Sequence, residues 1–270
     1  MQVNTYNLAQ QKTPNNFYLS PLIQFLAEVI PSSYIFRNNG ATNRTDLIIV
    51  MDQYHYKPFD EIHTLLDFAL LGHERLNCTV YTYGTIYELL SKGHLFFSNL
   101  CTPKNCVYQS NPYFNLPLLH QEKRNELVEK SKLVFNQNMQ KAITFFKGAC
   151  EFANENESTI SAFMLQQACE LTYRSLLLSL RGKQVKCHDL IVLRKHLRHF
   201  APTIIGILDK DEEKEIALLA TIQEAYIKSR YDQTYRISLN ELKTSISAAD
   251  QLIQSAQKIF NCQCEKILSP

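Results

Sequence analysis

The chain has 270 residues, of which 45% are hydrophobic and 20% are charged, and its formal net charge is +2. This composition is typical of a globular protein and excludes a disordered chain. No apolar run approaches the roughly 20 residues of a membrane-spanning helix, and the first residues lack the pattern of a secretory signal, so we expect a soluble, cytoplasmic protein.

Eight cysteines are many for a chain without a secretory signal. A reducing compartment disfavours disulfides. The closest pairs, Cys101 with Cys106 and Cys262 with Cys264, lack both the spacing and the nearby histidines of a zinc site. We therefore expect reduced thiols that fill core positions, and no structural metal.

The two halves of the chain differ in charge and in sequence pattern, since aromatic and β-branched residues with turns are typical of the first and helical repeats of the second. Residues 1–120 carry 7 Lys+Arg and 8 Asp+Glu, whereas residues 121–270 carry 21 and 18, so the net charges of −1 and +3 add to +2. Two prolines fall in the segment Asn111–Leu119, where this sequence pattern changes. We expect one domain over residues 1–118 and a second over residues 119–270.

Strand and helix patterns alternate in the first half, which predicts a small α+β domain. Helical spacing predicts helices at Phe17–Ile30, Pro58–His73 and Thr85–Lys92. β-branched and aromatic runs predict strands at Tyr34–Arg37, Thr45–Asp52, Asn77–Tyr83 and Cys106–Gln109. A turn is predicted at Asn38–Asn43, and the Thr45–Asp52 strand is apolar enough to be buried on both faces.

The second half is predicted to be an all-α, up-and-down bundle, because apolar stripes at helical spacing follow one another through short connections. The expected helices are Gln121–Ala153, Glu157–Leu180, His188–His199, Asp211–Ser229 and Leu239–Phe260.

Three separated motifs of the second half form a recognisable pattern. They are Ala162, Phe163, Gln166, Gln167, Ala168 and Glu170 on one helix, then His188, Asp189 and Leu190 at the start of the next, and finally Arg230 with Tyr231. In this order they resemble the HEPN domain over roughly residues 121–265. The resemblance implies a helical bundle that forms a homodimer and acts on a nucleotide or RNA.

HEPN bundles often follow a nucleotidyltransferase domain, and the first half resembles a degenerate one. A working member has a Gly-Ser turn, two acids one residue apart on a strand, and a third acid on a later strand, which together hold Mg²⁺. Here Gly40 precedes Ala41, Arg44 stands at the first acid, and Asp46 matches the second. The later strand, Asn77–Tyr83, has no acid. We expect an inactive domain in which Asp46 is a remnant metal ligand or only anchors its strand.

Many HEPN domains are metal-independent ribonucleases whose signature is Arg, four to six residues, then His. An imidazole can move the 2′-OH proton, and an arginine can stabilise the charged phosphate. Arg181 with His188 and Arg194 with His199 both fit the spacing, and Arg181 and His188 are the catalytic candidates. Their position argues against this role, because the family places the signature late in the bundle and no histidine follows His199. His188 has an alternative role in fixing the loop beside Asp189, which suits a helix N-cap.

A basic cluster surrounds these residues and predicts phosphate binding. Its members are Arg174, Arg181, Lys183, Lys186, Arg194, Lys195 and Arg198. The alternative is a solvated face whose acids come from a distant segment such as Asp209–Glu215. The leading hypothesis is a non-catalytic or regulatory module that binds a nucleotide or RNA phosphate, with a nucleotide as the one candidate cofactor. The alternatives are a ribonuclease, a residual nucleotidyltransferase, or a structural partner in a toxin–antitoxin or defence system.

Overall fold

A computed structural model describes most of the chain and divides it into two compact units. The first comprises Met1–Gly93 and Phe97–Leu119, and the second comprises His94–Phe96 and His120–Pro270. The described residues are 19–39, 45–54, 57–73, 76–182, 185–198, 200–232 and 234–268, without the side chains of Asn39, Pro202 and Arg230. Each unit is described by itself.

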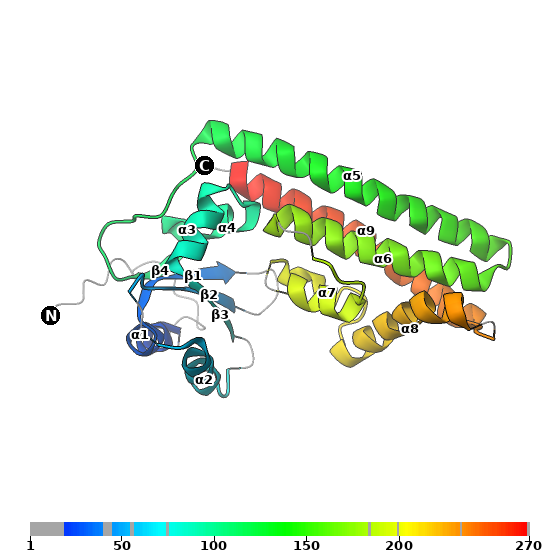
Figure 1. The fold of residues 1–270 in the computed structure, drawn as a ribbon, viewed down its shortest axis with the longest axis horizontal. Coiled ribbons are helices and arrows are strands. Elements are labelled where there is room, and N and C mark those ends of the chain that lie inside the picture. Colours follow the sequence, from blue (N-terminus) through cyan, green and yellow to red (C-terminus); the bar gives the residue numbers. More distant parts are fainter. Residues whose placement is uncertain are drawn as a thin grey trace. The chain divides into compact units, whose positions relative to one another are not determined.

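A four-stranded mixed sheet forms the centre of the first unit (Figure 1). The strands lie in the order β3-β2-β1-β4, in which β1 is antiparallel to β2 and β4 while β2 and β3 are parallel. The elements are α1 (Leu19–Val29), β1 (Ser32–Asn39), β2 (Thr45–Met51), α2 (Phe59–Ala69), β3 (Leu76–Thr82), α3 (Tyr83–Ser91), α4 (Leu95–Leu100), a 3-10 turn at Pro103–Asn105, and β4 (Cys106–Gln109). The parallel pair is joined through α2, as parallel strands require a crossover connection.

Strand β2 is buried on both faces, as its unbroken apolar run predicts. Alternate side chains on one face, Leu47, Ile49 and Met51, belong to the same core cluster as Leu26 of α1 and Ile62 of α2. Helices α1 and α2 lie on one side of the sheet, and α3 lies on the other (Figure 1). The predicted α+β class of the first half is therefore confirmed.

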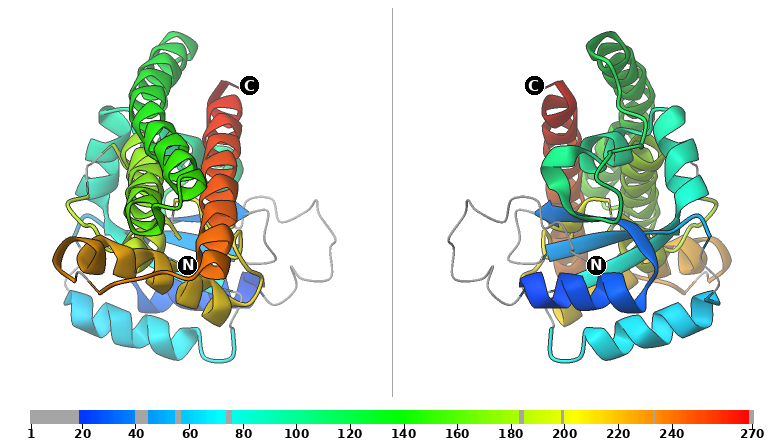
Figure 2. Two further views of the ribbon diagram at one scale, coloured as in Figure 1. Left: turned by 90° about the vertical axis from the view of Figure 1, so that its right-hand side faces the viewer. Right: turned by 90° about the vertical axis from the view of Figure 1, so that its left-hand side faces the viewer.

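The second unit is a helical bundle arranged around one central helix (Figures 1 and 2). Its elements are α5 (Gln121–Asn154), α6 (Ser158–Arg181), α7 (Leu190–Leu197), a 3-10 turn at Pro202–Ile204, α8 (Glu212–Tyr231) and α9 (Leu239–Leu268). Helix α6 contacts α5, α7, α8 and α9. The first and last helices also meet, since the rings of Phe135 and Phe260 stack with centroids 4.0 Å apart. The predicted bundle is confirmed.

More than half of the 24 residues of α6 are buried, including several polar ones. The hydroxyls of Thr172, Ser175 and Ser179 donate to main-chain carbonyl oxygens four residues earlier, at 2.7, 2.7 and 2.8 Å. These bonds satisfy the hydroxyls within the helix. Burial raises the pKa of the Cys169 thiol to about 12. Because only thiolates react or bind metals readily, this cysteine is an inert core residue.

Several boundaries differ from the prediction for local reasons. Helix α7 begins at Leu190 instead of His188, because the Asp189 side chain caps it and accepts hydrogen bonds from the N–H groups of Ile191 and Val192. Helix α4 was not predicted, and α9 continues to Leu268. In the predicted turn Asn38–Asn43, the first two residues belong to β1, and residues 40–43 lie outside the described residues.

All eight cysteines are free thiols, and burial raises the pKa of those at positions 106 and 264 to about 11. Within the described part of the chain, no helix combines the length and the apolar character needed to cross a membrane.

Candidate functional site

The candidate site is built on one face of α6, where Gln166, Glu170 and Arg174 follow one another at intervals of four residues. Side chains four apart on a helix lie next to each other. Gln166 and Glu170 are buried, whereas Arg174 is half-buried. The loop after α6 returns the chain to this face and adds His188. We refer to Gln166, Glu170, Arg174 and His188 as the Glu170 cluster.

The carboxylate of Glu170 is the centre of the cluster. Its side chain is 3% exposed, and a carboxylate buried this deeply needs partners. Oε1 accepts from Nη1 of Arg174 at 2.9 Å and lies 3.0 Å from Nδ1 of His188, while Oε2 lies 3.3 Å from the amide nitrogen of Gln166. Since an ionised carboxylate only accepts, this contact assigns the proton of a neutral His188 ring to Nδ1.

Main-chain contacts hold the loop in place beside the carboxylate. The Gln166 amide donates to the carbonyl oxygen of His188 at 3.2 Å, and Gln167 donates to the side-chain oxygen of Gln166 at 2.6 Å. One residue beyond the Asp189 cap, the N–H of Leu190 donates to the side-chain oxygen of Gln223 on α8 at 2.9 Å. The position of His188 is thus fixed from α6, α7 and α8.

The imidazole of His188 lies at the edge of the bundle and not in its core. Its side chain is 59% exposed, although Nδ1 faces Glu170. One face of the ring stacks on Tyr226 of α8, with centroids 5.7 Å apart. Among the residues that the structure describes, Nε2 has no hydrogen-bond partner. The cluster therefore presents one ring nitrogen to solvent and orients the other through a buried acid.

A second buried carboxylate, Glu215 on α8, forms a contrasting arrangement that we call the Glu215 cluster, with Arg194 and Glu212. Its Oε2 accepts from Nε of Arg194 at 3.0 Å and from the N–H of Gly206 at 2.9 Å, and its Oε1 accepts from the N–H of Leu208 at 3.1 Å. Arg194 also contacts Glu212 at 3.3 Å. Arg194 is 5% exposed and Glu215 is fully buried, so neither is available to a ligand.

The structure separates the predicted catalytic pair Arg181 and His188. His188 lies beside Glu170, and Arg181 follows Glu170 by eleven residues along α6, a rise of about 16 Å. The guanidinium of Arg181 lies over the ring of Phe200, 5.9 Å from its centroid. The arginine that the fold brings to His188 is Arg174, which shares the same carboxylate oxygen.

The predicted basic cluster is also divided by the fold. Arg174 belongs to the Glu170 cluster, and Lys186 and Lys195 are exposed. Arg198 is half-buried at the C-terminal end of α7. Arg194 is enclosed by acids from the segment that begins at Asp209, the alternative raised for this face, so we remove it from the phosphate-binding set. Lys183 and His199 lie outside the described residues.

In the first unit, Asp46 lies on β2 and is 5% exposed. Its Oδ1 accepts from the side-chain amide of Asn77 on the parallel strand β3, at 2.9 Å. Burial first, and then the charge of Asp46, raises the pKa of Cys78 to about 12. Gly40, Ala41 and Arg44 lie outside the described residues. Within the described part, no group of three or more His, Cys, Asp or Glu side chains could hold a metal.

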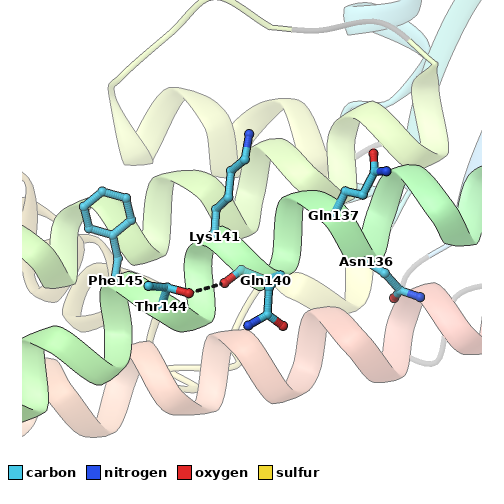
Figure 3. A pocket seen from close by; sticks show the side chains of 6 residues that line it. All are labelled: Asn136, Gln137, Gln140, Lys141, Thr144 and Phe145. Atoms are coloured by element: carbon cyan, nitrogen blue, oxygen red, sulfur yellow. Dashed lines mark hydrogen bonds between the residues drawn. The ribbon is translucent and has the colours of Figure 1, made fainter.

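A surface depression of about 780 Å³ lies elsewhere on the second unit, along α5 (Figure 3). The Thr144 hydroxyl in its wall donates to the carbonyl oxygen of Gln140 at 2.9 Å. Its lining residues are Asn136, Gln137, Gln140, Lys141, Thr144 and Phe145. None of these is a residue that the sequence predicts to be functional, and none belongs to the Glu170 cluster.

Sequence reasoning placed Glu170 in a motif but did not identify it as a site residue, and it missed Gln223 and Tyr226. A usable signal for Glu170 exists: Gln166, Glu170 and Arg174 form a polar line on a helix that is otherwise strongly apolar, and such a line must be partnered when the helix is buried. No comparable signal distinguishes Gln223 or Tyr226 within α8.

Comparison with known families agrees with the motifs on α6 and α7. Residues 136–267 match the family model of the HEPN domain, from within α5 to the end of α9. The C-terminal half of the chain is therefore a HEPN domain, as the motifs predict. No curated protein matches the chain.

Among solved structures, the chain is similar to a nucleotidyltransferase-like protein from Exiguobacterium sibiricum. The two are 10% identical, the match covers 91% of this chain and 78% of that chain, and the TM-score is 0.28. A similarity at this level carries no argument about the first unit, so its relation to nucleotidyltransferases stays a prediction from the sequence.

Proposed function

We propose that the HEPN domain binds the phosphate of a nucleotide or of RNA at the solvent side of the Glu170 cluster. The observation that carries the proposal is the convergence of Arg174 and His188 on Oε1 of one buried carboxylate. This arrangement places two nitrogen donors at the border between core and water. The presence of a HEPN domain supports a nucleotide- or RNA-related function.

The chemistry of both side chains suits an anion. A guanidinium has five N–H donors, and Glu170 is bonded to one nitrogen of Arg174, which leaves donors for a phosphate. His188 becomes a donor at Nε2 when its ring is protonated. Lys186 is exposed two residues before His188 and adds a positive charge to the same loop. Glu170 neutralises one positive charge, so we expect binding by a few contacts and not by a large basic surface.

The binding experiment uses the full chain with two probes, ATP and a short single-stranded RNA, at about 50 mM and 200 mM salt. We expect binding that weakens as salt rises and that Arg174→Ala and Lys186→Ala both reduce. Lys258→Ala on α9 is the matched control, because it removes a positive charge outside the loop. Lys186→Ala keeps the test decisive even if Arg174→Ala unfolds the bundle. Absent or salt-independent binding would exclude the phosphate site, and the two probes separate a free nucleotide from RNA.

One observation favours a second function, cleavage of RNA. Glu170 faces Nδ1 of His188 and leaves Nε2 in solvent, which is how a carboxylate orients an imidazole that acts as a general base. Arg174 would stabilise the charged phosphate in place of the predicted Arg181. Incubation of wild-type protein and His188→Ala with RNA tests this function. Cleavage that persists in the variant would exclude His188.

For the first unit we propose a nucleotidyltransferase-like domain without transferase activity. The support is that the carboxylate of Asp46 accepts from an amide, Asn77, on the strand where a working enzyme would supply an acid. Transfer of label from ATP to RNA in the presence of Mg²⁺, lost in Asp46→Asn, would contradict this proposal. A product that Asp46→Asn leaves unchanged would point to a different site.

We also propose that the protein forms a homodimer through its helical bundle. The HEPN domain supports this assembly, since the resemblance implies association through the bundle. Light scattering coupled to size-exclusion chromatography measures the mass of the particle. A mass of one chain across the accessible concentrations would contradict the dimer.

A further inference from the structure

Three aromatic rings form a nearly parallel ladder that ends at the candidate site. Phe163 of α6 stacks on Tyr226 of α8 with centroids 6.4 Å apart and planes inclined by 14°. Tyr226 in turn stacks on His188, with centroids 5.7 Å apart and planes inclined by 10°. The ladder starts at half-buried rings and finishes at an exposed one.

The last ring of the ladder is both exposed and fixed. Its Nδ1 lies 3.0 Å from Glu170, and its main-chain oxygen accepts from Gln166. One face of the imidazole lies against Tyr226, yet the side chain is 59% exposed. The opposite face and the Nε2 edge must therefore be in solvent. A ring held in this way loses little conformational freedom when a second flat group binds against it.

We propose that a base of single-stranded RNA stacks on the open face of His188, while the neighbouring phosphate contacts Arg174. This inference rests on the proposed phosphate site and names its ligand. A phosphate binds through charge and hydrogen bonds and does not stack on a ring. Aromatic side chains, histidine included, are the usual stacking partners of unpaired bases. Bases inside a duplex already stack on one another, so the ladder selects an unpaired strand.

The test measures binding of the full chain to three RNA probes, and affinities are compared per phosphate because a duplex carries the charge of two strands. The first is a hexamer of adenylates, the second is the same hexamer with abasic sugars, and the third is a duplex. We expect the single-stranded hexamer to bind at least about fivefold more tightly than the abasic hexamer, given the energy of stacking one base. The duplex should bind no better than the abasic hexamer.

Two substitutions locate the base. His188→Gln removes the ring and keeps a polar side chain, so it should bring the ratio of the two single-stranded affinities close to one. His188→Phe keeps a ring on Tyr226 and should retain a preference for the base. Circular dichroism of each variant confirms that the helices are intact. If His188→Phe is unfolded, Tyr226→Leu replaces it and should reduce the ratio by removing the ring beneath His188.

The outcomes separate this inference from the function on which it rests. Equal, salt-dependent binding of the hexamer and its abasic form would overturn base stacking and leave the phosphate site standing. No binding of any probe would overturn both. A preference for the base that His188→Gln leaves unchanged would show that the base binds elsewhere, and would also overturn the inference.

Discussion

The HEPN domain contains two buried carboxylates, each paired with an arginine. They differ in whether their partners are enclosed by protein or reach the solvent. Glu215 accepts from the Arg194 guanidinium and from two main-chain N–H groups, and both charged groups are withdrawn from water. Glu170 is as well buried, but its partners are the half-buried Arg174 and the exposed His188. The first carboxylate is surrounded by protein alone, and the second connects the core to the surface.

The comparison shows that burial of an acid does not by itself mark a functional site. What distinguishes the Glu170 cluster is that its partners retain hydrogen-bonding groups on the solvent side. A buried ion pair with every group enclosed contributes to the structure of the bundle, and its net effect on stability is often small. Breaking such a pair is costly, however, because the remaining charge stays buried without a partner.

The largest expected loss of stability is at the Glu215 cluster. Glu215→Ala leaves the Arg194 guanidinium and the N–H groups of Gly206 and Leu208 without their acceptor. We expect the free energy of unfolding to fall by about 3–5 kcal/mol. Thermal and urea denaturation measure it. Glu213→Ala is the matched control, because Glu213 lies in the same first turn of α8 and is exposed; equal losses in the two variants would contradict the role of the cluster.

A smaller loss of stability is expected at the Glu170 cluster. Glu170→Ala also removes a buried carboxylate, but water can reach Arg174, which is 21% exposed, and His188, which is 59% exposed. We expect about 1–3 kcal/mol of destabilisation, together with weaker RNA binding. A stability loss as large as that of Glu215→Ala, with RNA binding unchanged, would remove the distinction between the two clusters.

The smallest expected effect comes from Cys169, which is buried in the core side of α6 directly before Glu170. It concerns how stability changes with pH. Burial raises the pKa of the Cys169 thiol from 9.0 to about 12, so the folded state keeps the proton at a pH where the unfolded chain loses it. The stability associated with the protonated thiol is fully present below about pH 9 and is lost as pH rises toward 12. At about pH 10 this loss amounts to about 1–2 kcal/mol.

Cys169→Ala should therefore reduce the fall in stability between about pH 8 and pH 10, measured as the shift of the urea midpoint. The comparison is between pH slopes, so a constant cost of the substitution does not affect it. An unchanged slope would show that the thiol ionises as easily in the folded protein as in the unfolded chain.

Periodicity predicted most of the fold, because long helices and a buried strand repeat their apolar residues over many positions. It missed α4, whose six residues, Leu95–Leu100, are too few to show a helical period. It also began α7 at His188, since the helical pattern cannot show that Asp189 caps the helix with its side chain and leaves His188 in the loop.

The site was harder to predict, because its contacts join residues that spacing does not relate. His188 meets Glu170 across 18 positions of the chain, and Arg194 meets Glu215 across 21. The spacing of Arg181 and His188 suggested a pair, but α6 continues for eleven residues beyond Glu170 before the chain turns. The basic segment therefore contains one enclosed arginine, Arg194, while Arg174 and Arg181 lie on α6 and Arg198 lies at the end of α7.

The burial of α6 on nearly all sides has an evolutionary consequence. A side chain that fills space between closely packed helices can change little in volume without strain or a void. Substitution is therefore restricted along most of this helix, and an exposed helix such as the first turns of α5 is under no such restriction. This restriction gives a physical reason why the longest of the three sequence motifs, Ala162 to Glu170, lies on α6.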